Sequence, residues 1–223
     1  MNAAVSGIRF KLLRAVSTCA ALLLCQPALQ ADDAVGNAAH GAQLVSSCSG
    51  CHGQHGEGLA VSAFPRLAGQ AAPYLAKQLR DYAAGARENA VMLSFAKALS
   101  AQDIADVAAY YSNLGAPETK PVKADAKAAA AGRVLANLGD ARAGVQGCGN
   151  CHGPNGRGEP PALPYLAGQH AEYIAAQLEA WQQGRRHNDS GEQMATLSKK
   201  LSAEDIAAVS AWFAQQPPAA AQH

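Results

Sequence analysis

The stretch Cys48-Ser49-Gly50-Cys51-His52 returns one hundred residues later as Cys148-Gly149-Asn150-Cys151-His152. Each copy has the C-x-x-C-H spacing, in which two thiols can form thioethers with the two vinyl groups of one porphyrin and the adjacent histidine can ligate its iron. The two copies therefore predict two covalently attached c-type haems. The expected attachment residues are Cys48, Cys51, Cys148 and Cys151, and the expected iron ligands are His52 and His152.

Paired cysteines also occur in zinc sites and in redox-active disulfides. In a zinc ribbon the two pairs lie about 15–20 residues apart, which is far closer than here. A thioredoxin-like disulfide within each motif would follow a strand of a βαβ unit, and this sequence shows no such pattern. Haem attachment is therefore the preferred interpretation.

Residues 1–31 are typical of a secretory signal peptide. A basic segment with Arg9, Lys11 and Arg14 precedes an apolar stretch over residues 15–25, and Ala28-Leu29-Gln30-Ala31 offers a cleavage site. The apolar stretch is too short to span a bilayer easily. We expect cleavage near Ala31 and export to the periplasm.

Cleavage after Ala31 would remove Cys19 and Cys25, so that all four remaining cysteines belong to the two motifs. The mature chain would then have neither a free thiol nor a structural disulfide, although its destination is oxidising. Lipoprotein processing at Cys19 or Cys25 is the alternative, and the bulky Leu24 disfavours it at the second of these.

The charge pattern excludes a nucleic-acid partner. The mature chain would carry a net charge of −2, with −3 on residues 32–118 and +1 on residues 119–223. Nucleic-acid binding needs a concentrated basic face, which is missing here. The mild difference between the halves either orients docking on a charged partner or reflects scattered solvated charges.

Both halves of the chain contain the same series of segments, which indicates a tandem duplication. Residues 64–70 (FPRLAGQ) match 163–169 (LPYLAGQ), residues 74–79 match 173–178, and residues 99–105 match 201–207. The expected organisation is a signal peptide over 1–31, a first domain over 32–116, a linker over 117–125, a second domain over 126–216 and a disordered tail over 217–223.

The periodicity of each half predicts an all-α fold. Helices are expected over 72–84 and 171–183, with an apolar stripe in each and a glycine stop at Gly85 and Gly184. Further helices should begin at Ser100 and Ser202, where an aspartate three residues on suggests a capping box. Shorter helices are expected over 38–46 and 126–138, and no alternating β pattern is present.

Each half holds one methionine in a segment expected to be irregular. Met92 follows His52 by forty residues and Met194 follows His152 by forty-two. A thioether sulfur is a suitable sixth ligand for haem iron and raises its reduction potential. Core filling is the other use of methionine. The histidines His40, His55, His170 and His187 have no counterpart in the other half and are interpreted as surface residues.

Several further residues recur at matching positions and have two interpretations each. The carbonyl oxygens of Pro65 and Pro164 could accept the second N–H of the ligand histidines, or these prolines could simply end a loop. Tyr82 and Trp181 are expected mainly in the core. Arg87 and Arg186 could meet haem propionates, but solvated arginines are the simpler expectation.

Aromatic residues make up only 5% of the chain and alanine dominates its apolar residues. A core of this kind is thin, and a buried porphyrin would supply much of the missing apolar bulk. We therefore expect the haem-free chain to fold poorly.

Taken with the P-x-L-A-G-Q segments, the late methionines and the closing L-S-x-x-D-I-A helices, the two motifs resemble the dihaem cytochrome c4 family, which consists of two class I cytochrome c domains in tandem. This resemblance covers nearly all of residues 36–216. It implies close haem edges, a periplasmic and often loosely membrane-associated protein, and electron delivery toward a terminal oxidase. It also implies that Pro65 and Pro164 accept from the ligand histidines.

The expected function is therefore electron transfer between redox proteins, without catalysis and without a small-molecule substrate. The first alternative is a dihaem electron-transfer subunit of a periplasmic dehydrogenase, of the flavocytochrome sulfide dehydrogenase type. A dihaem peroxidase and a haem-based gas sensor are weaker alternatives, because each needs an iron with an open sixth position.

Overall fold

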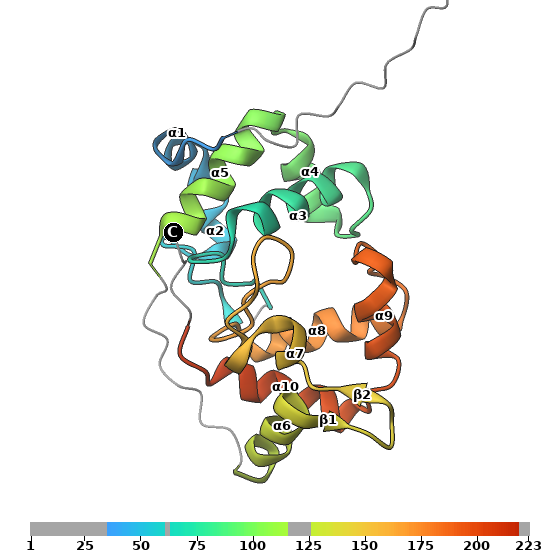
Figure 1. Ribbon diagram of the computed structural model, residues 1–223. Helices are drawn as coiled ribbons and strands as arrows, with labels where there is room; N and C mark the ends of the chain where they lie inside the picture. Colours follow the sequence, from blue (N-terminus) through green and yellow to red (C-terminus); the bar gives the residue numbers. More distant parts are fainter. Residues whose placement is uncertain (1–34, 61–62, 116–125, 219–223) are drawn as a thin grey trace, which may run out of the picture. The chain divides into compact units, whose positions relative to one another are not determined.

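The computed structural model in Figure 1 describes residues 35–60, 63–115 and 126–218, and these belong to one compact unit. The expected signal peptide (1–31), the linker (117–125) and most of the expected tail (217–223) lie outside the described residues. None of the helices in the described ranges is both long and apolar enough to cross a membrane.

The chain folds into two helical domains whose five α-helices follow one another in the same order, as the sequence predicts. The first contains α1 (Ala38–Leu44), η1 (Val45–Ser47), α2 (Ser49–His52), α3 (Ala72–Ala84), α4 (Ala90–Lys97) and α5 (Ala101–Asn113). The second contains α6 (Ala126–Leu138), β1 (Gly139–Asp140), β2 (Val145–Gln146), α7 (Gly149–His152), η3 (Pro154–Gly156), α8 (Ala171–Gln182), η4 (Ser190–Glu192), α9 (Gln193–Ser198) and α10 (Ala203–Ala214). In each domain the first and last helices lie side by side, α1 with α5 and α6 with α10 (Figure 1).

The helix boundaries follow the local signals in the sequence. Pro73 occupies the first turn of α3, and Gly85 ends that helix in a left-handed conformation with φ of 77°. Ser100 and Ser202 each form a complete capping box with the aspartate three residues on, at the start of α5 and α10. These capping bonds satisfy amide groups that the helix itself leaves without partners.

The expectation that the methionine segments are irregular is wrong. Met92 lies in α4 and Met194 in α9. Both helices are short, at 8 and 6 residues, so they show too few turns for a periodic signal. The short antiparallel pair β1–β2 was also not expected, because strands of two residues show no alternation.

Two glycines allow close contact between the first and last helix of each domain. A Cβ atom on Gly41 would lie 2.1 Å from the carbonyl oxygen of Asp106, and one on Gly132 would lie 2.1 Å from that of Ala208. A backbone atom at that distance cannot be accommodated by rotating a side chain. These helices therefore pack backbone against backbone at the two glycines.

Each domain has its own hydrophobic core beneath this helix pair. Val45, Leu75, Ile104, Val107 and Tyr111 are buried together in the first domain. The core of the second domain has larger side chains, among which Trp181 and Phe213 are buried. The first cysteine of each motif, Cys48 or Cys148, packs against the core of its own domain.

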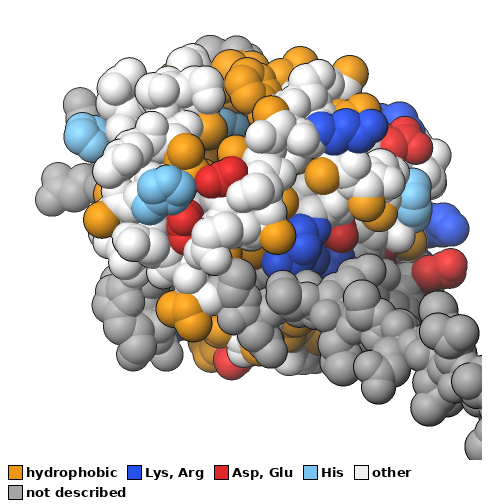
Figure 2. Space-filling view, turned by 90° about the horizontal axis from the view of Figure 1, so that it is seen from above, with side chains coloured by type: hydrophobic (Ala, Val, Ile, Leu, Met, Phe, Trp, Pro, Cys, Tyr) orange, Lys and Arg blue, Asp and Glu red, His pale blue; other side chains and the backbone are white. Residues whose placement is uncertain are grey.

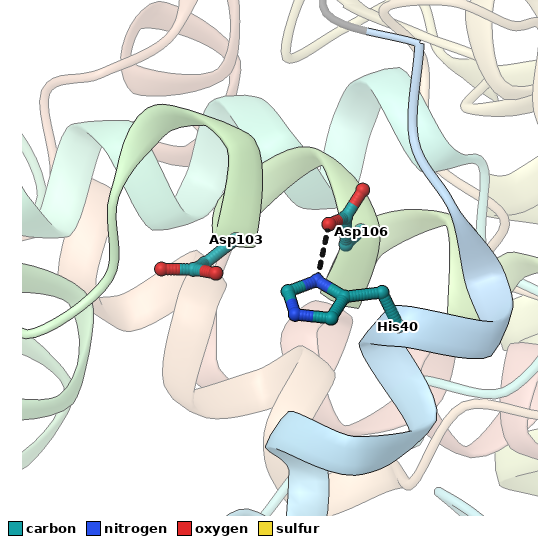
Figure 3. A group of neighbouring side chains, drawn as sticks. All are labelled: His40, Asp103 and Asp106. Carbon is teal, nitrogen blue, oxygen red and sulfur yellow. Dashed lines mark hydrogen bonds and ion pairs between the residues drawn. The ribbon is translucent and has the colours of Figure 1, made fainter.

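His40, for which the sequence indicated no role, is exposed but links two helices. Its Nδ1 lies 2.7 Å from Oδ2 of the buried Asp106, which ties α1 to α5 (Figure 3). Oδ1 of Asp106 accepts hydrogen bonds from the backbone N–H of Asn37 and from the side chain of Gln102. Asp103 lies near the pair but caps its own helix at Ser100. Because both Asp106 oxygens are engaged, the cluster joins two helices and offers no open metal site.

The Asp106→Asn variant is expected to unfold at a lower temperature than the native protein at pH 7, by an amount that shrinks in acid. The hydrogen bonds, first from the Asn37 N–H and then from His40, hold the pKa of Asp106 below its usual value. The stabilisation is therefore fully present above the unfolded pKa near 4 and is lost as the pH falls through the lowered folded pKa. Thermal unfolding at pH 7 and pH 3 measures this, with Glu88→Gln as the exposed control. An equal deficit at both pH values would contradict it.

Candidate haem sites and the interface between the domains

The first motif forms a single helical turn whose histidine points into the domain. Cys48 precedes α2, and His52 at the end of α2 is only 7% exposed. Its Nδ1 lies 3.0 Å from the carbonyl oxygen of Pro65. Cys51 is half-buried on the same turn.

The second motif repeats this geometry. His152 at the end of α7 is also 7% exposed, and its Nδ1 lies 3.0 Å from the carbonyl oxygen of Pro164. Burial raises the pKa of the Cys148 thiol to about 11, and it raises the pKa of Cys48 as well. The sequence left open whether these prolines accept a hydrogen bond from the motif histidines or simply end a loop. The two 3.0 Å contacts favour the hydrogen bond.

These hydrogen bonds determine which imidazole nitrogen can bind a metal. A carbonyl oxygen only accepts, so Nδ1 of each histidine carries the proton and Nε2 keeps its lone pair. Burial lowers the pKa of both His52 and His152, which favours the neutral imidazole that coordinates metals. Each histidine therefore keeps a lone pair on Nε2, the nitrogen through which such an imidazole can bind a metal.

A glycine-rich loop after each motif brings the proline carbonyl to the histidine. In the first domain Gly58 donates its N–H to the carbonyl of His52 at 2.7 Å, and Gly158 does the same to His152 at 2.6 Å. Gly56 turns the loop with φ of 71°, and its carbonyl accepts from the backbone of Leu67. The N–H of Leu166 likewise donates to the carbonyl of Gly156 in the second domain, so the same backbone hydrogen bonds bring a proline carbonyl to each histidine.

The methionines are held by their backbones at the start of short helices. The N–H of Met92 donates to the side chain of Asn89 at 2.9 Å, and the N–H of Met194 donates to Asp189 at 2.7 Å. Both methionines are half-buried, and Met194 packs with Cys148 against the core of the second domain. This placement is compatible with ligation, and the ligand role of both methionines stays a prediction.

The described residues fit covalent haem better than zinc. Cys48, Cys51, Cys148 and Cys151 form no disulfide. Across the described ranges, the group of three or more potential metal ligands that comes together consists of His40, Asp103 and Asp106, without any cysteine. Each motif thus presents two thiols and one Nε2 lone pair, which is the donor set for one porphyrin with its iron.

Sequence reasoning missed a reciprocal contact between the two domains. The side chain of Gln70 bonds to both the N–H and the carbonyl of Tyr165, at 3.0 and 3.1 Å. Gln169 bonds in the same way to the N–H and the carbonyl of Arg66, at 2.9 Å each. Matching residues thus make matching contacts, as across a two-fold axis. The identity of Gln70 and Gln169 in both repeats was the available signal.

The expectation that Arg87 and Arg186 are solvated is wrong. They are only 4% and 5% exposed, and they lie in this same interface. Arg87 donates to Tyr173 and Gln177 of the second domain, and Arg186 donates to Tyr74 and Gln78 of the first. Each guanidinium also lies over an aromatic ring of its own domain, Tyr82 at 4.7 Å and Trp181 at 3.9 Å from the ring centroid.

Two residues with no assigned role also join this interface. Arg66 is buried, donates to the carbonyl of Ala167 at 2.9 Å, and leaves its Nη1 without a hydrogen-bond partner. Burial lowers the pKa of Arg66 to about 10. His170, which the sequence placed at the surface, is half-buried and contacts the carbonyl of Glu57 at 2.9 Å. His55 and His187 are exposed, as expected.

The face of the molecule shown in Figure 2 carries mixed charge. Acidic and basic side chains are scattered there among apolar and uncharged ones.

Two repeated motifs on two helical domains, each with a carbonyl-bound buried histidine, define a dihaem c-type electron-transfer protein. The sequence matches the cytochrome c family over residues 38–115 and again over residues 129–217. The chain therefore belongs to the cytochrome c family, as a tandem protein of the cytochrome c4 kind with two covalently attached haems.

Three known proteins illustrate the similarity. The thiosulfate dehydrogenase electron acceptor of Thiomonas intermedia is 44% identical over 78% of this chain and 80% of its own. Cytochrome c4 of Azotobacter vinelandii is 40% identical over 81% of this chain and 89% of its own. The crystal structure of reduced cytochrome c4 from Pseudomonas stutzeri superposes with a TM-score of 0.76 at 36% identity, covering 82% of this chain and all of that one.

Proposed function

We propose that this protein is a periplasmic electron carrier without catalytic activity, which delivers electrons toward a terminal oxidase. In this proposal residues 1–31 are a cleaved signal peptide, and the haem domains span 32–116 and 126–216. Each haem supplies an iron that cycles between Fe(II) and Fe(III). The chain's own residues attach it, orient its ligands and exclude water from them.

The geometry above supports a role for each residue of the two sites. Cys48 and Cys51 attach the first haem, and Cys148 and Cys151 attach the second. His52 with Met92 would hold the first iron and His152 with Met194 the second, while the carbonyl oxygens of Pro65 and Pro164 would fix the histidine rings. No carboxylate among the described residues bonds to Arg87 or Arg186, so haem propionates are suitable counter-ions for them.

The observation that carries this proposal is the pair of buried histidines with identical carbonyl partners. A carrier needs rigid ligands whose geometry is the same in both oxidation states, whereas a peroxidase or gas sensor needs one iron with an easily vacated position. The two sites are built alike, and each domain offers one methionine for the sixth position. Neither domain is thus marked as a catalytic site.

A second candidate is an electron acceptor that works with a dehydrogenase. The similarity to the thiosulfate dehydrogenase electron acceptor of Thiomonas intermedia favours it. The same two domains would serve both functions, and only the redox partners, donor and acceptor, would differ.

The proposal is tested with the mature dihaem protein and its visible spectrum. Purified terminal oxidase should oxidise the reduced protein, and thiosulfate alone should leave the oxidised protein unreduced. Reduction by thiosulfate alone would show catalysis and contradict the carrier. Reduction only when a thiosulfate dehydrogenase is added, with no oxidation by the oxidase, would establish the second candidate instead.

A further inference from the structure

The second domain contains a continuous series of contacts, one cation–π contact followed by hydrogen bonds, from the domain interface to the helix that carries Met194. This path consists of Arg186, Trp181 and Asp189, and we call it the Asp189 path. The described residues of the first domain contain no equivalent path. Its role depends on the proposed function in one respect, namely that Met194 is an iron ligand.

Asp189 receives three hydrogen bonds from two different elements. Its Oδ2 accepts from the N–H of Met194 at 2.7 Å and from the N–H of Ala195 at 3.1 Å. Its Oδ1 accepts from the indole N–H of Trp181 at 3.1 Å. Because hydrogen bonds to a charged acceptor are stronger than neutral ones, this carboxylate fixes the start of α9 against α8.

Trp181 connects this carboxylate to the interface. Its ring is buried in the core of the second domain, and the guanidinium of Arg186 lies 3.9 Å from the ring centroid. Arg186 in turn donates to Gln78 in α3 of the first domain at 3.2 Å. Gln78 in the first domain is therefore connected to Met194 through successive contacts of Arg186, Trp181 and Asp189.

The first domain holds its methionine differently. Tyr82 stands at the position of Trp181, and the described residues contain no hydrogen bond between Tyr82 and the cap of α4. That cap is Asn89, a neutral side chain that accepts from the N–H of Met92. Arg87 lies 4.7 Å from the centroid of the Tyr82 ring, farther than in the second domain.

The difference coincides with an insertion in the chain. Met92 follows Arg87 by five positions, whereas Met194 follows Arg186 by eight. The extra residues form the 3-10 turn η4, in which Gly191 and Glu192 have φ of 63° and 54°. A left-handed glutamate is strained. The carboxylate of Asp189 spans this turn and holds the start of α9 in spite of it.

We infer that Asp189 is a positioning residue for Met194, and that it couples the coordination of the second haem to the domain interface through Trp181. Met194 should then be held more firmly than Met92. Loss of Asp189 should free Met194 to leave the iron while Met92 stays in place. Loss of the indole N–H alone should have the same effect in weaker form.

The experiment uses the oxidised dihaem protein and two readouts, the charge-transfer band of methionine–Fe(III) coordination and the affinity for added imidazole. Met194→Ala serves as the reference, because it identifies the signals of the second haem by removing about half of the band. Asp189→Ala should remove most of that same half and raise the imidazole affinity of that haem at least tenfold. Asp189→Asn and Trp181→Phe, which conserve shape, should raise it about threefold each. Asn89→Ala is the matched control and should affect the first haem alone.

Native band intensity and native imidazole affinity in Asp189→Asn and Trp181→Phe would overturn the inference, whether or not Asp189→Ala folds. An unchanged band in Met194→Ala would instead show that Met194 is not a ligand, which is a failure of the proposed function. The two failures are therefore distinguishable.

Discussion

The Met194→Leu variant is expected to lower the reduction potential of one haem by more than about 0.1 V, within the roughly 0.8 V range over which axial ligands set haem potentials. A thioether favours Fe(II), and its loss removes that preference. Leucine conserves the volume of methionine, so packing against the core of the second domain should change little. Met92→Leu should lower the potential of the other haem. Redox titration and carbon monoxide binding measure both effects.

The matched control is Leu197→Ala on the same helix, α9. Leu197 is half-buried and packs against the same core as Met194. Its loss should reduce stability by about 2–5 kcal/mol, as for other leucine truncations, and leave both potentials unchanged. If Met194→Leu keeps both potentials and excludes carbon monoxide, then Met194 only fills the core.

The helices and the haem motifs were predictable because their signals are local. Pro73 and Gly85 mark the ends of α3 within a few residues, and Ser100 with Asp103 specifies the start of α5 through direct hydrogen bonds. The C-x-x-C-H spacing is also a local constraint, since it reflects the reach of two thiols. Such features need no knowledge of how distant segments meet.

The interface was not predictable from these signals. Gln70 and Tyr165 are 95 residues apart, and nothing near either residue shows that they pair. Arg87 was expected in solvent because charged side chains usually are, but tyrosine and glutamine from the other domain satisfy its donors. Burial of this kind depends on the tertiary arrangement. The duplication offered one indirect sign, since both arginines and both glutamines recur in each repeat.

Removing both thiols of one motif is expected to unfold the domain that contains it. In Cys148→Ala/Cys151→Ala, the second domain should lose its cooperative thermal transition. The expected loss is the whole free energy of unfolding of that domain, which is about 5–15 kcal/mol for a typical domain. The reason is the thinness of the cores. Ten of the twenty-five buried apolar residues are alanine, so a porphyrin supplies apolar surface that the side chains lack. Small domains with so little core usually need a further staple.

Circular dichroism during heating measures this loss, and the two domains control for each other. Cys48→Ala/Cys51→Ala should abolish the transition of the first domain, and the four-cysteine variant should show none. Ser49→Ala, which leaves all four thiols in place, should unfold like the native protein. A cooperative transition within a few degrees of the native one in the four-cysteine variant would contradict the expectation. Packing of the protein's own residues, such as α1 against α5 and α6 against α10, would then be enough to stabilise the helices. Haem would in that case bind to a domain that is already folded.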